Sequence, residues 1–175
     1  MFKKWIAMLL AVGFLAGCDQ KAQASLLPEM DNFHFVAQQA REKNIPIMIM
    51  FTAYHCEFCS QVDAAVLTPM MRGGLYDGYA MYMRKVSTDN SRQIVFSPSE
   101  SLSKFDFARM YRADITPTVI FVDWRGLPVA EPLVGSMDVQ LYAAMIHQRL
   151  NVAYERIGNP MRLPVNPEQM RRPLP

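Results

Sequence analysis

Two cysteines separated by two residues are the part of this chain best suited to chemistry. In the stretch FTAYHCEFCSQV, Cys56 and Cys59 follow an apolar run and stand ahead of a segment with helical spacing. A thiol just ahead of a helix faces unpaired backbone N–H groups and the positive end of the helix dipole, and both favour its thiolate form. We therefore expect the pKa of Cys56 to lie below about 8.5, the value of a free cysteine.

A thiolate is the attacking species in thiol–disulfide exchange, so position gives the two sulfurs different roles. Cys59 is expected one helical turn deeper, close enough to Cys56 to close a disulfide and too buried to compete for a substrate. The sequence predicts that Cys56 attacks a disulfide of a partner protein, that a mixed disulfide forms, and that Cys59 resolves it. This chemistry needs no cofactor, but it needs a redox partner that regenerates the pair.

Three neighbours of the cysteines can tune them. His55 either stabilises the thiolate when protonated or is only an exposed turn residue, and Phe58 either contacts the substrate or shields the disulfide. Glu57 places a negative charge near the thiolate and should raise the pKa of Cys56. A less stable thiolate makes the disulfide harder to reduce, so Glu57 favours a reductant over a strong oxidant. The effect is small because an exposed charge is screened.

The bulk composition is that of one folded domain. Half of the 175 residues are apolar, which provides for a real core. Of the 18 basic side chains, Lys3 and Lys4 lie in the first seventeen residues, and the remaining 16 balance the 16 acidic ones. A neutral body gives no reason to propose nucleic acid as a partner.

The first residues have the form of an export signal. The two lysines precede an apolar run, 5–16, that is too short to span a bilayer as a mature helix. The run ends in LAGC, residues 15–18, which resembles the lipobox of bacterial lipoproteins. The resemblance implies a signal peptide over 1–17, a lipid on Cys18 as the first mature residue, and a tether over 18–31.

The same resemblance assigns a compartment. Asp19 is similar to the signal that retains lipoproteins in the inner membrane of enteric-type bacteria. We therefore expect a lipid-anchored protein on the periplasmic side of a bacterial membrane, with the inner membrane slightly favoured. There Cys56 and Cys59 form the one remaining pair, in a compartment where disulfides persist unless something actively reduces them.

Helices and strands are expected to alternate along the rest of the chain. Strands are expected at four apolar or β-branched runs, namely 45–53, 79–87, 115–123 and 129–134. Helices are expected after Asp31 as a cap, from Cys59, after Ser101 or Ser103, and after Ser136. The first of them should close at Asn44, the second should end or kink at Thr68-Pro69, and the last should end at Gly158.

Two segments depart from this alternation. Residues 88–101 are polar and serine-rich around a small apolar centre, and we interpret them as an inserted loop with a short hairpin. Residues 158–175 hold five of the twelve prolines, so we expect a flexible, solvated tail.

With this order of elements, residues 32–157 resemble the thioredoxin fold. Two stretches carry the resemblance, HCEFC between the first buried strand and its helix, and ITPT at 115–118 ahead of a strand and hairpin. The resemblance implies an α/β protein whose central mixed sheet is flanked by helices, with an N-terminal helix and an insert around 88–101. It further implies that Pro117 is cis and lies against the disulfide, and that Thr116 offers its backbone to an incoming substrate strand.

The chain departs from thioredoxin itself in three ways. Met50 stands where thioredoxin carries a buried acid, His55 replaces the usual tryptophan, and Glu57-Phe58 replaces Gly-Pro. It is most similar to the periplasmic thioredoxin-like proteins. We therefore expect a thiol–disulfide oxidoreductase, a reductant by preference, that acts on proteins with cysteines or disulfides.

Three alternatives remain open, namely a static staple, a metal site and a non-catalytic adaptor. A static staple is disfavoured because so small a loop gives little entropic stabilisation. Copper delivery, known for some thioredoxin-fold proteins, requires a third ligand from His34, His55 or His147, of which we expect His34 and His147 at the surface. Structural zinc is disfavoured because there is no second cysteine pair. A non-catalytic adaptor in a membrane complex would need neither the cysteine pair nor the Thr-Pro.

Overall fold

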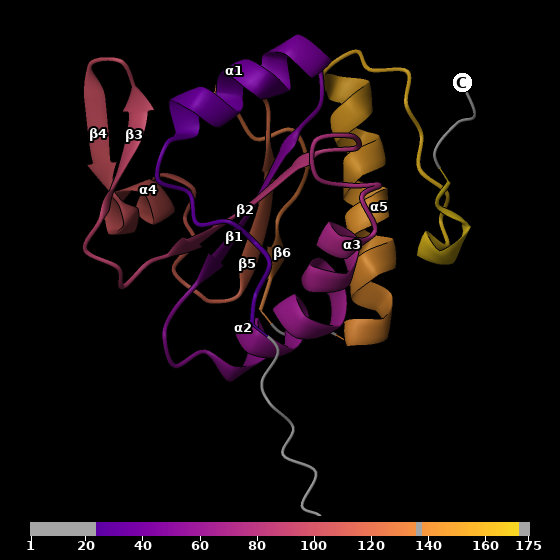
Figure 1. The fold of residues 1–175 in the computed structure, drawn as a ribbon, viewed down its shortest axis with the longest axis horizontal. Coiled ribbons are helices and arrows are strands. Elements are labelled where there is room, and N and C mark those ends of the chain that lie inside the picture. Colours follow the sequence, from indigo (N-terminus) through magenta and orange to yellow (C-terminus); the bar gives the residue numbers. More distant parts are fainter. Residues whose placement is uncertain (1–23, 136–137, 172–175) are drawn as a thin grey trace, which may run out of the picture.

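The computed structural model describes residues 24–135 and 138–171 and is built on a four-stranded mixed sheet (Figure 1). The strands are β1 (Ile47–Thr52), β2 (Tyr82–Ser87), β5 (Thr118–Val122) and β6 (Leu133–Val134), in the order β2-β1-β5-β6. β1 runs parallel to β2 and antiparallel to β5, and β6 is antiparallel to β5. The mixed central sheet expected from the sequence is confirmed.

The central strand β1 is buried on both faces. Met48 and Met50 point into one core, whereas Ile47, Ile49 and Phe51 point into the other, and all five are at most 1% exposed. Side chains alternate between the faces of a strand, so a strand covered on both sides needs apolar residues at every position. This explains the continuous apolar run ahead of the cysteines.

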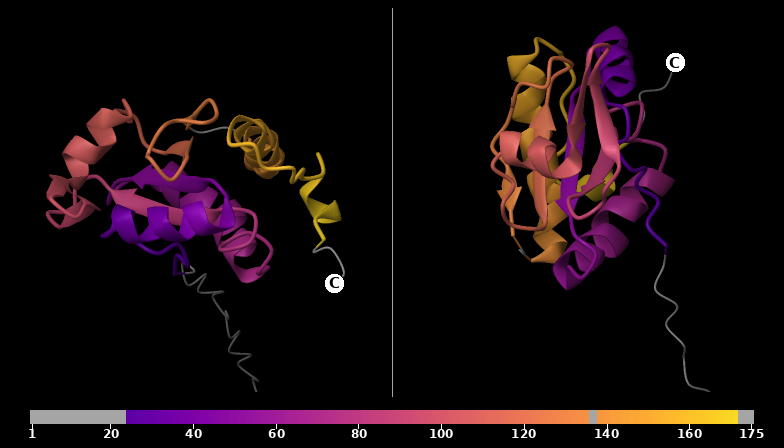
Figure 2. Two further views of the ribbon diagram at one scale, coloured as in Figure 1. Left: turned by 90° about the horizontal axis from the view of Figure 1, so that it is seen from above. Right: turned by 90° about the vertical axis from the view of Figure 1, so that its left-hand side faces the viewer.

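Helices cover both faces of the sheet. The first face carries α2 (Glu57–Val62), the π-helix η1 (Asp63–Leu67), α3 (Thr68–Arg72) and α5 (Val139–Arg156). The second face carries α1 (Phe33–Lys43), α4 (Lys104–Met110) and the hairpin of β3 (Gln93–Ser97) and β4 (Glu100–Ser103). The view from above in Figure 2 shows the hairpin and α4 at one end of the molecule and the C-terminal segment at the other.

Helix boundaries differ from expectation at three places. Asn32, and not Asp31, caps α1 through its side chain, and Asp138 caps α5, whereas Ser136 lies outside the described residues. The helix expected from Cys59 begins at Glu57; at Thr68-Pro69, where it was expected to end or kink, it passes from the π-helix η1 into α3 and continues to Arg72. A π-turn immediately before the proline explains this, because that wider turn leads into α3 with Pro69 in its first turn, where no N–H is needed.

Residues 25–31, expected to be part of a tether, are packed against the domain. Leu27 and Met30 are at most 3% exposed, and Met30 N–H donates to the carbonyl of Lys85 at 2.7 Å. Glu29 accepts hydrogen bonds from Ser87 and from the fully buried ammonium of Lys104, the latter at 2.6 Å. The tether prediction is wrong for these residues because they extend the outer edge of β2.

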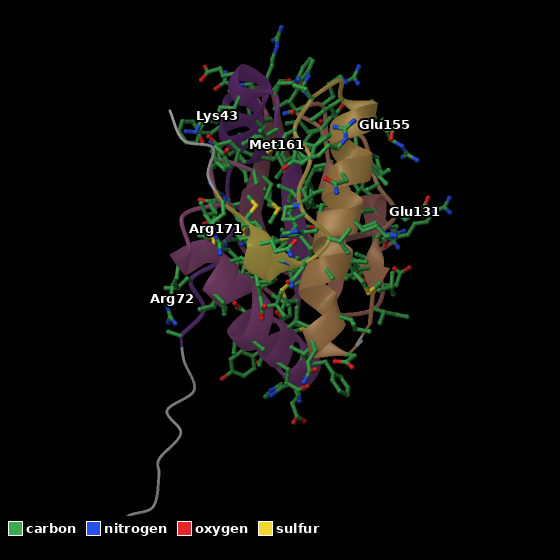
Figure 3. The ribbon with its side chains drawn as sticks, turned by 90° about the vertical axis from the view of Figure 1, so that its right-hand side faces the viewer. Lys43, Arg72, Glu131, Glu155, Met161 and Arg171 are labelled. Carbon is green, nitrogen blue, oxygen red and sulfur yellow. A yellow bond between two sulfur atoms is a disulfide. The ribbon has the colours of Figure 1, made fainter. Side chains whose placement is uncertain are left out.

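The C-terminal segment is likewise ordered, contrary to the expected flexible tail. Leu163 and Met170 are each 5% exposed, and Asn151 on α5 exchanges two hydrogen bonds with the backbone of Leu163, at 3.0 and 2.7 Å. The short 3-10 helix η2 (Pro167–Gln169) follows. Figure 3 shows this segment, with Met161 and Arg171 labelled, beside α5. Residues 172–175 lie outside the described part.

Cys18, Asp19 and the predicted signal peptide also lie outside the described residues. Within 24–135 and 138–171, none of the helices combines the length and the apolar character that crossing a bilayer requires.

Candidate active site

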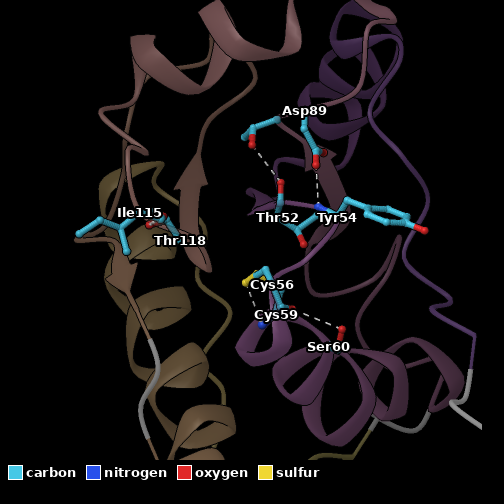
Figure 4. Close-up of a disulfide and its surroundings, with 9 residues drawn as sticks. Thr52, Tyr54, Cys56, Cys59, Ser60, Asp89, Ile115 and Thr118 are labelled. Carbon is cyan, nitrogen blue, oxygen red and sulfur yellow. Dashed lines mark hydrogen bonds between the residues drawn. A yellow bond between two sulfur atoms is a disulfide. The ribbon is translucent and has the colours of Figure 1, made fainter.

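Cys56 and Cys59 form a disulfide at the junction of β1 and α2 (Figure 4). Their Cα atoms are 5.2 Å apart. Cys56 is the N-cap of α2, and its Sγ accepts the backbone N–H of Cys59 at 3.2 Å. A free amide at the mouth of the helix is therefore aimed at the first sulfur, which is the arrangement that stabilises a thiolate there.

The two sulfurs differ in access. Cys56 is partly exposed, whereas Cys59 is 2% exposed and belongs to the core on the α5 side of the sheet. A macromolecular disulfide can reach only the first of them. The difference in burial expected from the helical turn is thus present in the fold.

Hydrogen bonds from the neighbouring loop hold the turn that leads from β1 to the cysteines. The Tyr54 N–H donates to a carboxylate oxygen of Asp89 at 2.7 Å, and Thr88 donates its N–H and its hydroxyl to the carbonyl of Thr52 (Figure 4). Asp89 lies in the segment expected to be an insert, and sequence reasoning did not connect it with the site. An acidic residue directly after a parallel strand was the available signal, because β1 and β2 end at the same edge of the sheet.

The Thr116–Pro117 peptide bond is cis, as the resemblance implied. β5 begins at Thr118, which pairs with Phe51 in the antiparallel ladder with β1. The residues before Thr118 therefore lie at the sheet edge where β1 ends and the cysteine turn begins. The Pro117 carbonyl accepts the N–H of Gly135 at 2.8 Å, and the Thr118 hydroxyl donates to the Ile115 carbonyl at 2.6 Å.

Several side chains at this end of the sheet are exposed. Tyr54 is 84% exposed, Phe58 53% and Ile115 59%. His55 and Glu57 are also exposed, and the His55 ring packs edge-on against the Tyr54 ring with 4.5 Å between centroids. The site therefore offers apolar contact area beside a reachable sulfur.

Of the candidate metal ligands, His147 is not at the surface but fully buried. Its Nδ1 lies 2.6 Å from the Pro164 carbonyl, which can only accept, so Nδ1 donates and Nε2 accepts the Tyr76 hydroxyl at 2.7 Å. Both ring nitrogens are therefore engaged in hydrogen bonds, and neither is available to bind a metal. Burial lowers the pKa of His147 and raises the pKa of Tyr76 to about 12.

The other histidines do not complete a metal centre with the cysteines. His34 is half-buried on α1, on the opposite face of the sheet from Cys59. Across the described parts of the chain, no three His, Cys, Asp or Glu side chains are grouped as metal ligands would be.

Comparison with known proteins places the chain in a class. Residues 36–150 match the model of the thioredoxin-like domain, and the chain belongs to that family. No curated protein matches the chain. Among solved structures, an oxidoreductase named DsbH is similar with a TM-score of 0.51 and 14% identity, over 73% of this chain and 87% of that one.

Two further structures are similar at a lower level. Oxidized thioredoxin O2 from Arabidopsis thaliana has a TM-score of 0.49 and 18% identity, covering 71% of this chain and 94% of its own. A thioredoxin-fold protein from Helicobacter pylori has a TM-score of 0.48 and 14% identity, with 65% and 83% covered. Family membership, together with a bridged cysteine pair at the helix mouth, makes this protein a thiol:disulfide oxidoreductase.

Proposed function

We propose that this protein is a lipid-anchored thiol–disulfide oxidoreductase outside the cytoplasm, which reduces disulfides in other proteins. The observation that carries the proposal is the pairing of a reachable Cys56 at a helix N-terminus with a buried Cys59 in bonding distance. That asymmetry serves a two-step exchange, in which one sulfur meets the substrate and the other releases it.

The reduced pair acts in two steps. The Cys56 thiolate attacks a substrate disulfide, a mixed disulfide forms, and the first substrate sulfur leaves as a thiolate that takes up a proton. The Cys59 thiolate then attacks the Cys56 sulfur, the intramolecular disulfide closes, and the second substrate sulfur leaves and is protonated. The substrate gains two electrons and two protons, and a second dithiol partner restores the pair by the reverse exchange.

The substrate is held by the residues around Cys56. The partly exposed Thr116 lies beside β1's end, where its backbone can pair with an extended substrate segment. Phe58 and His55 contribute contact area on the other side of the sulfur. Protein substrates suit this open site, because a chain can supply both backbone pairing and apolar contacts.

The proposed direction of electron flow is supported by Glu57 in the first turn of α2, whose charge opposes a stable thiolate. Equilibration of the pair with glutathione tests it. We expect a reduction potential below about −200 mV, towards that of thioredoxin at about −270 mV. A potential near about −120 mV belongs to strong oxidants and would overturn the reducing assignment.

The location rests on LAGC, which ends at Cys18, and on Asp19. In cells fed a labelled fatty acid, the wild-type protein should carry label and sediment with the inner membrane. Cys18→Ser should lose the label and leave the membrane fraction. A Cys18→Ser protein that stays labelled and membrane-bound would contradict the anchor.

A further inference from the structure

The resolving step has a proton to remove from a buried group. Cys59 is 2% exposed, and burial in an apolar core favours the neutral thiol over the thiolate that must attack. The strand beside it supplies no base, because Met50 is an apolar residue that is itself 1% exposed. Another group must accept the proton.

A pocket of about 740 Å³ opens beside Cys59, at the edge of the sheet where β1 and β2 end. Cys59, Asp63 and Lys85 line it together with His55 and Asp89, whereas Cys56 and Glu57 do not. Asp89 is engaged by the Tyr54 N–H, and Asp63 shares the helix of Cys59. A water molecule takes about 30 Å³ of liquid, so the pocket has room for several. Hydroxyl, carboxylate and ammonium groups are among those that line it, which suits water.

Asp63 is held in place on the same helical face as Cys59. It follows Cys59 by four residues, a spacing that stacks side chains about 6 Å apart along a helix. The hydroxyl of Thr68, a residue that is 1% exposed, donates to Asp63 Oδ1 at 2.8 Å, and the Thr68 N–H donates to the Asp63 carbonyl. The π-turn that begins at Asp63 brings Thr68 into this position.

Lys85 enters the pocket from the sheet. It pairs with Met50 in the parallel ladder of β1 and β2, and paired residues share a face, so its side chain points to the α2 side. Among the described residues its ammonium makes no ion pair, although it lines the same pocket as Asp63. A positive charge there stabilises the Cys59 thiolate.

We propose that Asp63 accepts the proton of Cys59 through pocket water, while Lys85 stabilises the thiolate that results. The carboxylate becomes a carboxylic acid, the thiolate attacks the Cys56 sulfur, and the departing sulfur later takes the proton by way of solvent. This inference rests on the exchange function proposed above and names the groups that serve its second step.

A model disulfide separates the two steps. Reduced Cys18→Ser full-length protein, in which only Cys56 and Cys59 carry thiols, is mixed with 5,5′-dithiobis(2-nitrobenzoate). Attack by Cys56 releases one coloured thiolate, and resolution by Cys59 releases the second. If the Cys18→Ser protein with Asp63 intact shows no second release, the exchange function itself is contradicted, independently of the role of Asp63.

In that background, Asp63→Asn should slow the second release at least tenfold at neutral pH, because general-base assistance contributes about 10² or more. The first release should stay within about twofold. Asparagine keeps an acceptor for Thr68, and Asp63→Glu should restore part of the rate. Equal slowing of both releases, or an unchanged second release, would overturn the proposal.

Two further variants complete the test. Glu57→Gln, which alters a charge outside the pocket, should change the first release and leave the second within about twofold. Lys85→Met should move the pH profile of the second release to higher pH. An unmoved profile would remove Lys85 from the mechanism, and a second release controlled by Glu57 would assign the proton to that residue instead.

Discussion

Stability should fall as the pH drops below about 6.5, because the fold holds His147 as a neutral ring. The ring is fully buried, Nδ1 donates to Pro164, and Nε2 accepts the Tyr76 hydroxyl. A protonated ring cannot accept at Nε2, so protonation breaks this contact. Burial accordingly lowers the pKa of His147 from its ordinary value of 6.5.

The sign and size follow from proton linkage. Below about pH 6.5 the unfolded chain binds a proton at His147 and the native protein does not, so the stability present at higher pH is lost as the pH falls. One such proton changes the free energy of unfolding by at most 1.36 kcal/mol per pH unit. Integrated from about pH 7.5 to 5.5, the loss is at most about 1.4 kcal/mol.

Urea unfolding of the oxidised protein across this range measures the loss. His147→Leu should be less stable than wild type at the upper end by about 1–3 kcal/mol, since the Tyr76 hydroxyl is left buried without an acceptor. Its stability should then change less with pH. If the variant and the wild type keep parallel pH dependences, the neutral buried ring is refuted.

Three other perturbations probe the site and its supports. Glu57→Gln should raise the reduction potential by about 10 mV, since an exposed charge contributes about 0.5 kcal/mol and 30 mV corresponds to 1.4 kcal/mol; a lower potential in the glutathione equilibrium would contradict this. Lys104→Met should lower the free energy of unfolding in urea by about 3 kcal/mol, because it removes the ammonium that compensates the charge of the part-buried Glu29 carboxylate. An unchanged free energy of unfolding would show that the ion pair is dispensable. Gly126→Ala should lower the melting temperature, as φ is 80° and a Cβ would lie 3.0 Å from the Tyr111 hydroxyl; an unchanged temperature would show that the turn relaxes.

Local patterns were sufficient to predict the elements that place the cysteines. A short apolar run predicts a doubly buried strand, and the cysteines after it predict a helix mouth, because both depend on residues close in sequence. Ser103, one of two candidates for the cap of α4, fills that position through the same local logic. The cis bond before Pro117 came from the resemblance and not from any local preference.

The unpredicted features depend on partners distant in sequence. The C-terminal segment is ordered because buried α5 residues hold it, as where the Nδ1 of His147 donates to the Pro164 carbonyl. Tyr154 donates to the carbonyl of Ala80, and Asn159 to that of Asn44. The five prolines of residues 158–175 reflect a local backbone preference, which carries no information about contacts with residues distant in sequence. The Asp63–Lys85 pocket was missed for the same reason.

The division of labour between the two sulfurs is tested most directly by trapping. Reduced Cys59→Ser and Cys56→Ser proteins, each combined with Cys18→Ser, are incubated with a disulfide-bonded protein substrate and analysed intact by mass spectrometry. The account predicts a stable mixed disulfide on Cys56 in the first protein and little or none on Cys59 in the second. Equal trapping on both sulfurs, or trapping on Cys59 alone, would contradict it.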